Sequence, residues 1–117
     1  MKILVAEDEP MMLKALDLCL RSDGHEVLLA RDGKEALSLF SEMKPDLVIT
    51  DIIMPFKSGV ELLKEVMELN QNLPVLVLTA LEKDEVKEMA LGYGALEYMT
   101  KPFNPKELKK RINDLLV

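Results

Sequence analysis

The chain has no tryptophan, a single cysteine and a single histidine among its 117 residues. Cys19 alone cannot form an internal disulfide, which is typical of proteins in a reducing compartment. No apolar run reaches the roughly 18–20 residues of a membrane span. Acidic residues 7–9 follow the first apolar residues before a signal-peptide core could form. We therefore expect a soluble, cytoplasmic protein that does not associate with membranes.

An excess of basic residues is also absent, because 15 lysines and arginines face 21 aspartates and glutamates, for a formal net charge of −6. This balance argues against direct nucleic-acid binding by this domain, although it does not exclude a DNA-binding partner domain. Hydrophobic residues make up 49% of the chain, which is typical of a folded domain. The length predicts one domain over residues 1–117, with no second domain in this chain.

Several enzyme classes lack their sequence signatures. No glycine-rich phosphate loop of either common spacing occurs, so nucleotide binding is not indicated. The one histidine, His25, follows Gly24 in an expected turn, where we predict a solvated side chain, and no serine has an apparent histidine partner. Cys19 lies on an apolar helical stripe, which favours a core position over a reactive one.

Short apolar runs alternate with amphipathic stretches along the chain. Helical spacing is present at residues 12–20, 33–43, 59–67, 86–90 and 105–115, and the predicted strands are 3–6, 27–30, 47–50, 75–79 and 96–99. Asp32 and Asn104 are placed as helix N-caps, and Pro105 is suited to a first helical position. A strand–helix unit repeated five times, with nearly continuous apolar strands, predicts an α/β fold with a doubly wound parallel sheet.

Polar residues follow the predicted strands at their carboxyl ends, where open parallel sheets place their sites. Glu7 and Asp8 follow the first strand and Asp51 the third, while Thr79 ends the fourth and Lys101 follows the fifth. One such residue alone is better explained by a strand leaving the core for solvent. Coincidence at four strand ends favours a site.

Electrostatics then restricts what that site could do. Two carboxylates about 4 Å apart repel by roughly 4 kcal/mol at an effective dielectric of about 20, so three need counter-charge or a shifted proton. Lys101 supplies one positive charge, and carboxylates with waters suit Mg²⁺ (or Mn²⁺). A carboxylate nucleophile, a metal, a lysine and the Thr79 hydroxyl together favour phosphoryl transfer.

Four segments carry a family resemblance: KILVAEDEP, DLVITDIIMPFKSG, PVLVLTA and GALEYMTKPF. In order and spacing they resemble the receiver domains of two-component response regulators, along the whole chain. The resemblance implies a flavodoxin-like (βα)5 fold with strand order 2-1-3-4-5. It also implies a phosphoryl group received from a sensor histidine kinase or a phosphotransfer protein.

By this resemblance Asp51 is the phosphoacceptor. Asp8 would ligate Mg²⁺ directly and Glu7 partly through water, while the Ile53 backbone carbonyl would complete the protein ligands. The resemblance implies that Lys101 pairs with phosphoryl oxygens and is joined to Pro102 by a cis bond.

The resemblance further implies that Thr79 and Tyr98 form a switch pair, in which the threonine moves toward the phosphoryl group and the ring turns inward. The surface they control would be made by the fourth helix, fifth strand and fifth helix. Its charged residues partly resemble the dimer face of regulators joined to winged-helix DNA-binding domains, which suggests a phosphorylation-promoted homodimer. These residues are Lys87, Glu97, Glu107, Lys110 and Arg111.

Some positions depart from the commoner family pattern. Glu7 replaces a more frequent aspartate, and Phe56 and Lys57 stand where small or polar residues are more usual. Two roles remain open for Phe56, a loop staple or an exposed partner contact. Ile53 and Leu81 occupy positions that tune dephosphorylation in the family, and both are apolar, which leaves the phosphoryl lifetime open.

Two other functions remain open on the sequence. One is a phosphorylation-independent interaction module on the same fold, against which the intact acidic, threonine and lysine positions argue. The other is a phosphatase with an aspartyl-phosphate intermediate, which commonly needs a second acid where Ile53 stands. We expect a regulatory phosphoacceptor, with at most self-catalysed phosphotransfer and autodephosphorylation.

Overall fold

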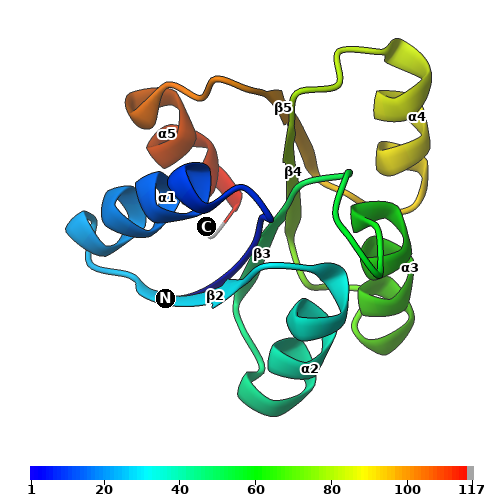
Figure 1. Ribbon diagram of the computed structural model, residues 1–117, viewed down its shortest axis with the longest axis horizontal. Helices are drawn as coiled ribbons and strands as arrows, with labels where there is room; N and C mark the ends of the chain where they lie inside the picture. Colours follow the sequence, from blue (N-terminus) through cyan, green and yellow to red (C-terminus); the bar gives the residue numbers. More distant parts are fainter. Residues whose placement is uncertain (116–117) are drawn as a thin grey trace.

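A sheet lies between two layers of helices in the computed structural model, which describes residues 1–115 (Figure 1). The strands are β1 (Lys2–Ala6), β2 (Glu26–Ala30), β3 (Leu47–Thr50), β4 (Val75–Thr79) and β5 (Glu97–Thr100). The helices are α1 (Pro10–Ser22), α2 (Gly33–Met43), α3 (Gly59–Leu69), α4 (Asp84–Gly92) and α5 (Pro105–Leu115). Within the described residues, no helix has the length and apolar character needed to cross a membrane.

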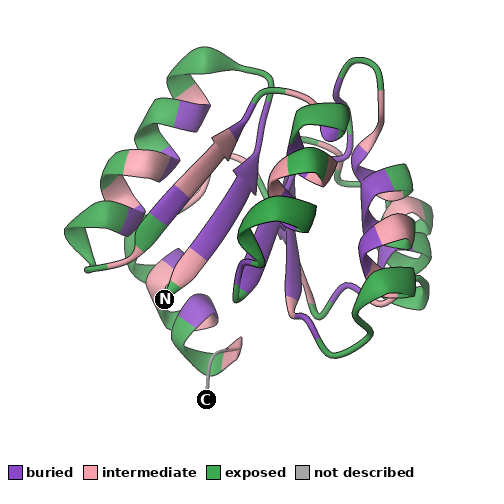
Figure 2. Ribbon diagram, turned by 90° about the horizontal axis from the view of Figure 1, so that it is seen from below, coloured by how far each residue is buried: buried purple, intermediate pink, exposed green. Residues whose placement is uncertain are grey.

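The five strands are all parallel and lie in the order β2-β1-β3-β4-β5. Both the predicted fold class and the strand order are therefore confirmed. The innermost strands carry mostly buried residues, as Figure 2 shows by colour. This order puts the carboxyl ends of β1 and β3 side by side, with β4 next to β3.

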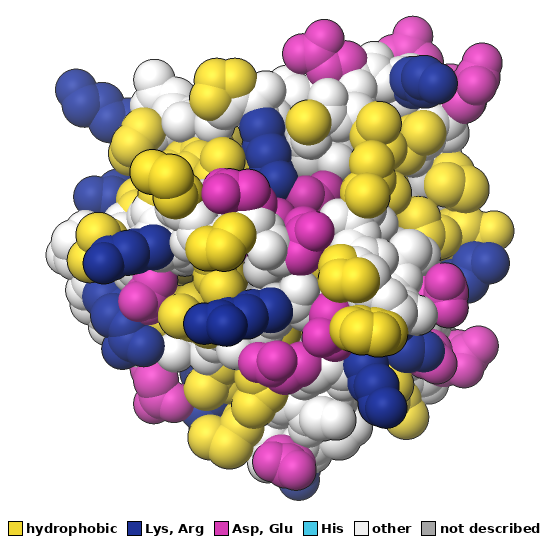
Figure 3. Space-filling model, viewed as in Figure 1, with side chains coloured by type: hydrophobic (Ala, Val, Ile, Leu, Met, Phe, Trp, Pro, Cys, Tyr) yellow, Lys and Arg dark blue, Asp and Glu magenta, His cyan; other side chains and the backbone are white. Residues whose placement is uncertain are grey.

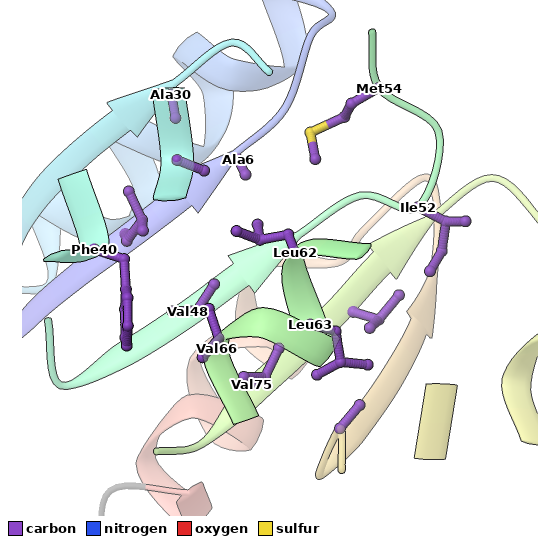
Figure 4. Packing of buried hydrophobic residues seen from close by; sticks show 14 of the residues in the cluster. Ala6, Ala30, Phe40, Val48, Ile52, Met54, Leu62, Leu63, Val66 and Val75 are labelled. Atoms are coloured by element: carbon purple, nitrogen blue, oxygen red, sulfur yellow. The ribbon is translucent and has the colours of Figure 1, made fainter. Parts of the chain in front are cut away.

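Alternate residues of each inner strand belong to two separate cores. Leu4 and Ala6 of β1 pack in the core under α2, α3 and α4, which Figure 4 shows from close by. Ile3 and Val5 of the same strand pack in the core under α1 and α5. This alternation is the reason the strand sequences are continuously apolar.

Helix ends agree with the predicted signals. The Asp32 side chain accepts a hydrogen bond from the Glu35 backbone N–H at 2.7 Å, and Asn104 accepts one from the Lys106 N–H at 2.9 Å. Gly24, with φ of 88°, follows the end of α1 in the left-handed region. Both predicted N-caps are confirmed.

The structure corrects several details. The first two strands begin one residue earlier than predicted, at Lys2 and Glu26, and the fifth runs over Glu97–Thr100 rather than residues 96–99. Leu96, just before that strand, is 57% exposed. His25 is half-buried rather than fully solvated. Cys19 packs partly buried against the α1/α5 core, as its helical position predicted.

Gly59, the first residue of α3, has no space for a side chain. A Cβ there would lie 1.7 Å from the Asp51 carbonyl oxygen, whereas a Cβ on Gly92 would meet nothing within 4 Å. We predict that Gly59→Ala lowers the free energy of unfolding by about 2–3 kcal/mol. The control, Gly92→Ala, should be neutral or stabilising by up to about 1 kcal/mol. Urea denaturation measures both, and equal losses in the two variants would contradict the close approach.

Candidate functional site

Three carboxylates meet where β1 and β3 end. Asp51 is brought beside the end of β1 by its backbone N–H, which donates to the Ala6 carbonyl at 3.0 Å. Carboxylate oxygens of Glu7, Asp8 and Asp51 lie within 4.8 Å of one another. Glu7 and Asp51 are buried while Asp8 is exposed, so the cluster opens to solvent on one side. Acidic side chains gather near the centre of the face in Figure 3.

Lys101 reaches this cluster from the loop after β5. Its backbone N–H donates to the Thr79 carbonyl at 2.8 Å, and the Lys101–Pro102 peptide is cis, as the resemblance implied. The Nζ donates to Asp51 Oδ2 at 2.7 Å and also to Glu7 Oε1. Burial alone would lower the pKa of Lys101, but the hydrogen bonds and charges of Asp51 and Glu7 outweigh it and raise that pKa. The ammonium therefore stays charged over the physiological range.

The second oxygen of Asp51 is held by backbone amides. Oδ1 accepts from the Ile52 N–H at 2.6 Å and, more weakly, from the Ile53 N–H at 3.4 Å. The carboxylate is thus fixed between an ammonium and the start of the β3–α3 loop. Such preorganised donors stabilise negative charge on this carboxylate.

The buried, acidic surroundings of Glu7 disfavour ionisation of its side chain. One of its oxygens contacts Lys101, and the other accepts from the Glu9 backbone N–H at 3.2 Å. Burial raises the pKa of Glu7, with a further increase from the Asp51 charge, although the hydrogen bonds from Lys101 and Glu9 act in the opposite direction. Ionised Glu7 is therefore held at a free-energy cost in the folded state.

Thr79 and Tyr98 are joined through Leu81, in the loop after β4. The Thr79 hydroxyl accepts from the Leu81 N–H at 3.5 Å, and the Tyr98 hydroxyl donates to the Leu81 carbonyl at 2.7 Å. Burial, and to a smaller extent the charge of Asp51, raises the pKa of Tyr98. A chain of contacts thus leads from the buried Thr79 to the half-buried Tyr98.

The charged residues expected on the α4–β5–α5 surface are partly paired within the chain. Arg111 donates to both Glu97 oxygens at 2.8 and 2.6 Å, and to Glu107 at 3.1 Å. Lys87 and Tyr98 line a hollow of about 280 Å³ between α4 and β5. Lys110 is exposed on α5.

Sequence reasoning missed the contributions of the backbone. Nothing in the side-chain pattern identifies the amides of Ile52 and Ile53 as Asp51 donors, and Glu9 was not expected to cap α1, which it does with bonds of 3.2 and 2.7 Å to two backbone N–H groups. The sequence left two roles open for Phe56, a loop staple or an exposed partner contact. Phe56 has φ of 67° at the centre of a γ-turn, a left-handed conformation that costs a side-chain residue about 1–2 kcal/mol.

Residues 3–113 match the family described as the response regulator receiver domain, so the chain belongs to that family. The chain is 38% identical over 115 residues to the alkaline phosphatase synthesis transcriptional regulatory protein PhoP of Bacillus subtilis, covering 98% of this chain and 48% of that protein. It spans about half the length of the curated relatives it matches.

Solved structures agree with the family. A response regulator receiver domain from Clostridium thermocellum has a TM-score of 0.93 at 36% identity, with 98% of this chain and 93% of that chain covered. A chain in the CheX-CheY-BeF3-Mg+2 complex from Borrelia burgdorferi has a TM-score of 0.95 at 28% identity, with 99% and 89% covered.

The raised pKa of Glu7 predicts a pH dependence of stability. Between its usual value of 4.5 and its higher folded value, the folded state binds more protons than the unfolded state, so stability falls as pH rises through that window. Because glutamine does not titrate, the Glu7→Gln variant does not lose stability in this way as the pH rises. In metal-free buffer, the free energy of unfolding of Glu7→Gln minus that of the wild type should grow as pH rises from 4.5. Urea titrations at several pH values measure it, and a difference that shrinks would contradict the assignment.

Proposed function

We propose that Asp51 accepts a phosphoryl group from a phosphorylated histidine of a sensor kinase or phosphotransfer protein. The observation that carries the proposal is the environment of Asp51: buried, with Lys101 Nζ 2.7 Å from one oxygen and the Ile52 N–H 2.6 Å from the other. A structural aspartate in an apolar sheet would not need two further carboxylates within 4.8 Å. The protein is then a regulatory switch in the cytoplasm and not a turnover enzyme.

In the proposed step, an Asp51 carboxylate oxygen bonds to phosphorus as the phosphorus–nitrogen bond of the donor histidine breaks. The nitrogen keeps the electron pair and the imidazole is released, with any proton it needs taken from water. Lys101 remains beside the acceptor and compensates the charge of the phosphoryl oxygens. The Thr79 hydroxyl, at the adjacent strand end, donates a hydrogen bond to one of them after moving from Leu81.

The acidic cluster fits a hard divalent cation, because oxygen ligands from carboxylates and waters are what Mg²⁺ (or Mn²⁺) takes. When bound, the ion supplies positive charge that offsets the phosphoryl oxygens. The exposed Asp8 and the acceptor Asp51 are the proposed direct ligands, with the Ile53 carbonyl. Glu7, whose carboxylate lies within 4.8 Å of those of Asp8 and Asp51, acts partly through water. The Mg²⁺ named in the Borrelia complex supports this reading.

The phosphorylated state is proposed to act through the Thr79–Leu81–Tyr98 contacts. Movement of Thr79 alters the loop after β4, and Tyr98 transmits the change to the α4–β5–α5 surface, which shifts a pre-existing equilibrium. That surface engages an output domain or effector, or a second copy in a phosphorylation-promoted homodimer. No direct nucleic-acid contact by this domain is proposed. Its charged residues are Lys87, Glu97, Glu107, Lys110 and Arg111.

Substitution of the acceptor tests the function directly. With radiolabelled acetyl phosphate and Mg²⁺, Asp51→Asn should take up no label, and Lys101→Ala should be labelled roughly a hundredfold more slowly. Asp114→Asn, an acid on α5 outside the cluster, should behave as the wild type. Undiminished labelling of Asp51→Asn would reject the assignment.

Binding of Mg²⁺ can be measured independently of phosphorylation. Titration with Mg²⁺ should shift the backbone amide signals of Ile52 and Ile53 in ¹⁵N–¹H spectra, because both N–H groups donate to Asp51. Asp8→Asn should weaken binding by at least about tenfold while the spectrum stays folded. Equal Mg²⁺ affinity in Asp8→Asn and the wild type would contradict the metal assignment.

A further inference from the structure

Phe56 combines two features that rarely occur together. Its side chain is 86% exposed, so the core gains nothing from the ring. Its backbone has φ of 67°, and the Lys57 N–H donates to the Pro55 carbonyl at 2.8 Å across it, which makes it the centre of a γ-turn. Glycine, which has no Cβ, would adopt this conformation at lower cost. Folding therefore does not account for an aromatic residue here.

The loop around Phe56 is fixed on both sides. The Gly59 N–H donates to the Ile52 carbonyl at 2.8 Å and closes the loop. Met54 is buried in the core under α2, α3 and α4, where Figure 4 labels it. Lys57 folds onto α3, with Nζ 2.7 Å from Glu65. The ring is consequently presented to solvent from an anchored turn.

This loop is also the one that holds the phosphoacceptor. Ile53, three residues before Phe56, is 61% exposed, and its N–H points to Asp51 Oδ1 at 3.4 Å. A molecule that covers both Ile53 and Phe56 therefore lies beside the mouth of the acidic cluster. Two exposed apolar side chains at a site entrance mark an interaction surface better than one scattered residue does.

The net charge of the acidic cluster indicates which kind of phosphodonor can bind at this surface. Three carboxylates against the one ammonium of Lys101 leave the cluster with a formal charge of −2, which a divalent cation would only neutralise. A negatively charged phosphoryl group therefore meets no net attraction. A protein donor can instead gain binding energy from uncharged contacts remote from the reacting atoms. An exposed phenylalanine offers such contact, with about 150–250 Å² to bury, which a donor the size of acetyl phosphate cannot cover.

We propose that Phe56, with Ile53, forms the apolar docking point for the histidine-bearing domain of the phosphodonor protein. The proposal rests on the proposed function of Asp51. It assigns Phe56 to recognition of a protein donor and leaves the chemistry at Asp51 independent of it.

The test compares a protein donor with a small one. The protein donor is the autophosphorylated sensor-kinase core that labels the wild-type chain fastest among those of the source genome. Phe56→Asn, which suits a positive φ, should reduce the rate of transfer from this core by at least tenfold. Labelling by acetyl phosphate should stay within twofold of the wild type, and thermal stability should be equal or higher. Phe56→Tyr should retain transfer, and Leu69→Ser, an exposed apolar residue at the end of α3, should change neither rate.

Each other result is informative. Unchanged transfer from the kinase core to Phe56→Asn overturns the docking role, as does equal loss with both donors, which would place Phe56 in the chemistry. A shift of the unphosphorylated protein from dimer to monomer in Phe56→Asn would make this surface a self-interface and also overturns the proposal. Failure of the proposed function is distinguishable, since the wild type would then take label at Asp51 from neither donor.

Discussion

The ion pairs of Lys101 with Asp51 and Glu7 connect the parts of this molecule that matter for its site. They link the loop after β5 to the ends of β1 and β3, so three strands converge on one ammonium group. Without that charge, two buried carboxylates would face each other and repel in a poorly solvated pocket. The position of the lysine follows from the parallel order of the sheet, because only parallel strands end together at one edge.

Much of the fold, and part of the candidate site, could be predicted from the sequence. Alternating strand and helix patterns predicted the fold class, and the caps at Asp32 and Asn104 set two helix starts correctly. Strand order came from the family resemblance, since periodicity carries no information on which strands are neighbours. Acids at the carboxyl ends of β1 and β3 were predicted to share one site, because parallel strands place these ends at one edge of the sheet, and the structure brings them within 4.8 Å.

The features that could not be predicted from the sequence depend on the exact backbone conformation. The amides that hold Asp51, the link of Tyr98 to Leu81 and the γ-turn at Phe56 are each set by local geometry that no residue pattern encodes. Leu96 was placed in a strand because leucine is apolar, yet the chain turns so that this side chain faces solvent. Glu7 looked like a metal ligand only, and its longer arm also lets it contact Lys101.

The register of the sheet has a consequence for how the molecule can move. Lys2 pairs with Glu26 and Ile3 with Leu47, so every strand pair encloses at least one helix and no pair can form as a local hairpin. Such non-local pairing makes folding cooperative, and partial melting of one strand would disrupt both cores at once. Displacing a whole strand would therefore cost more free energy than displacing a loop that connects the strands to the helices. The sheet is a frame that holds those loops at its carboxyl edge.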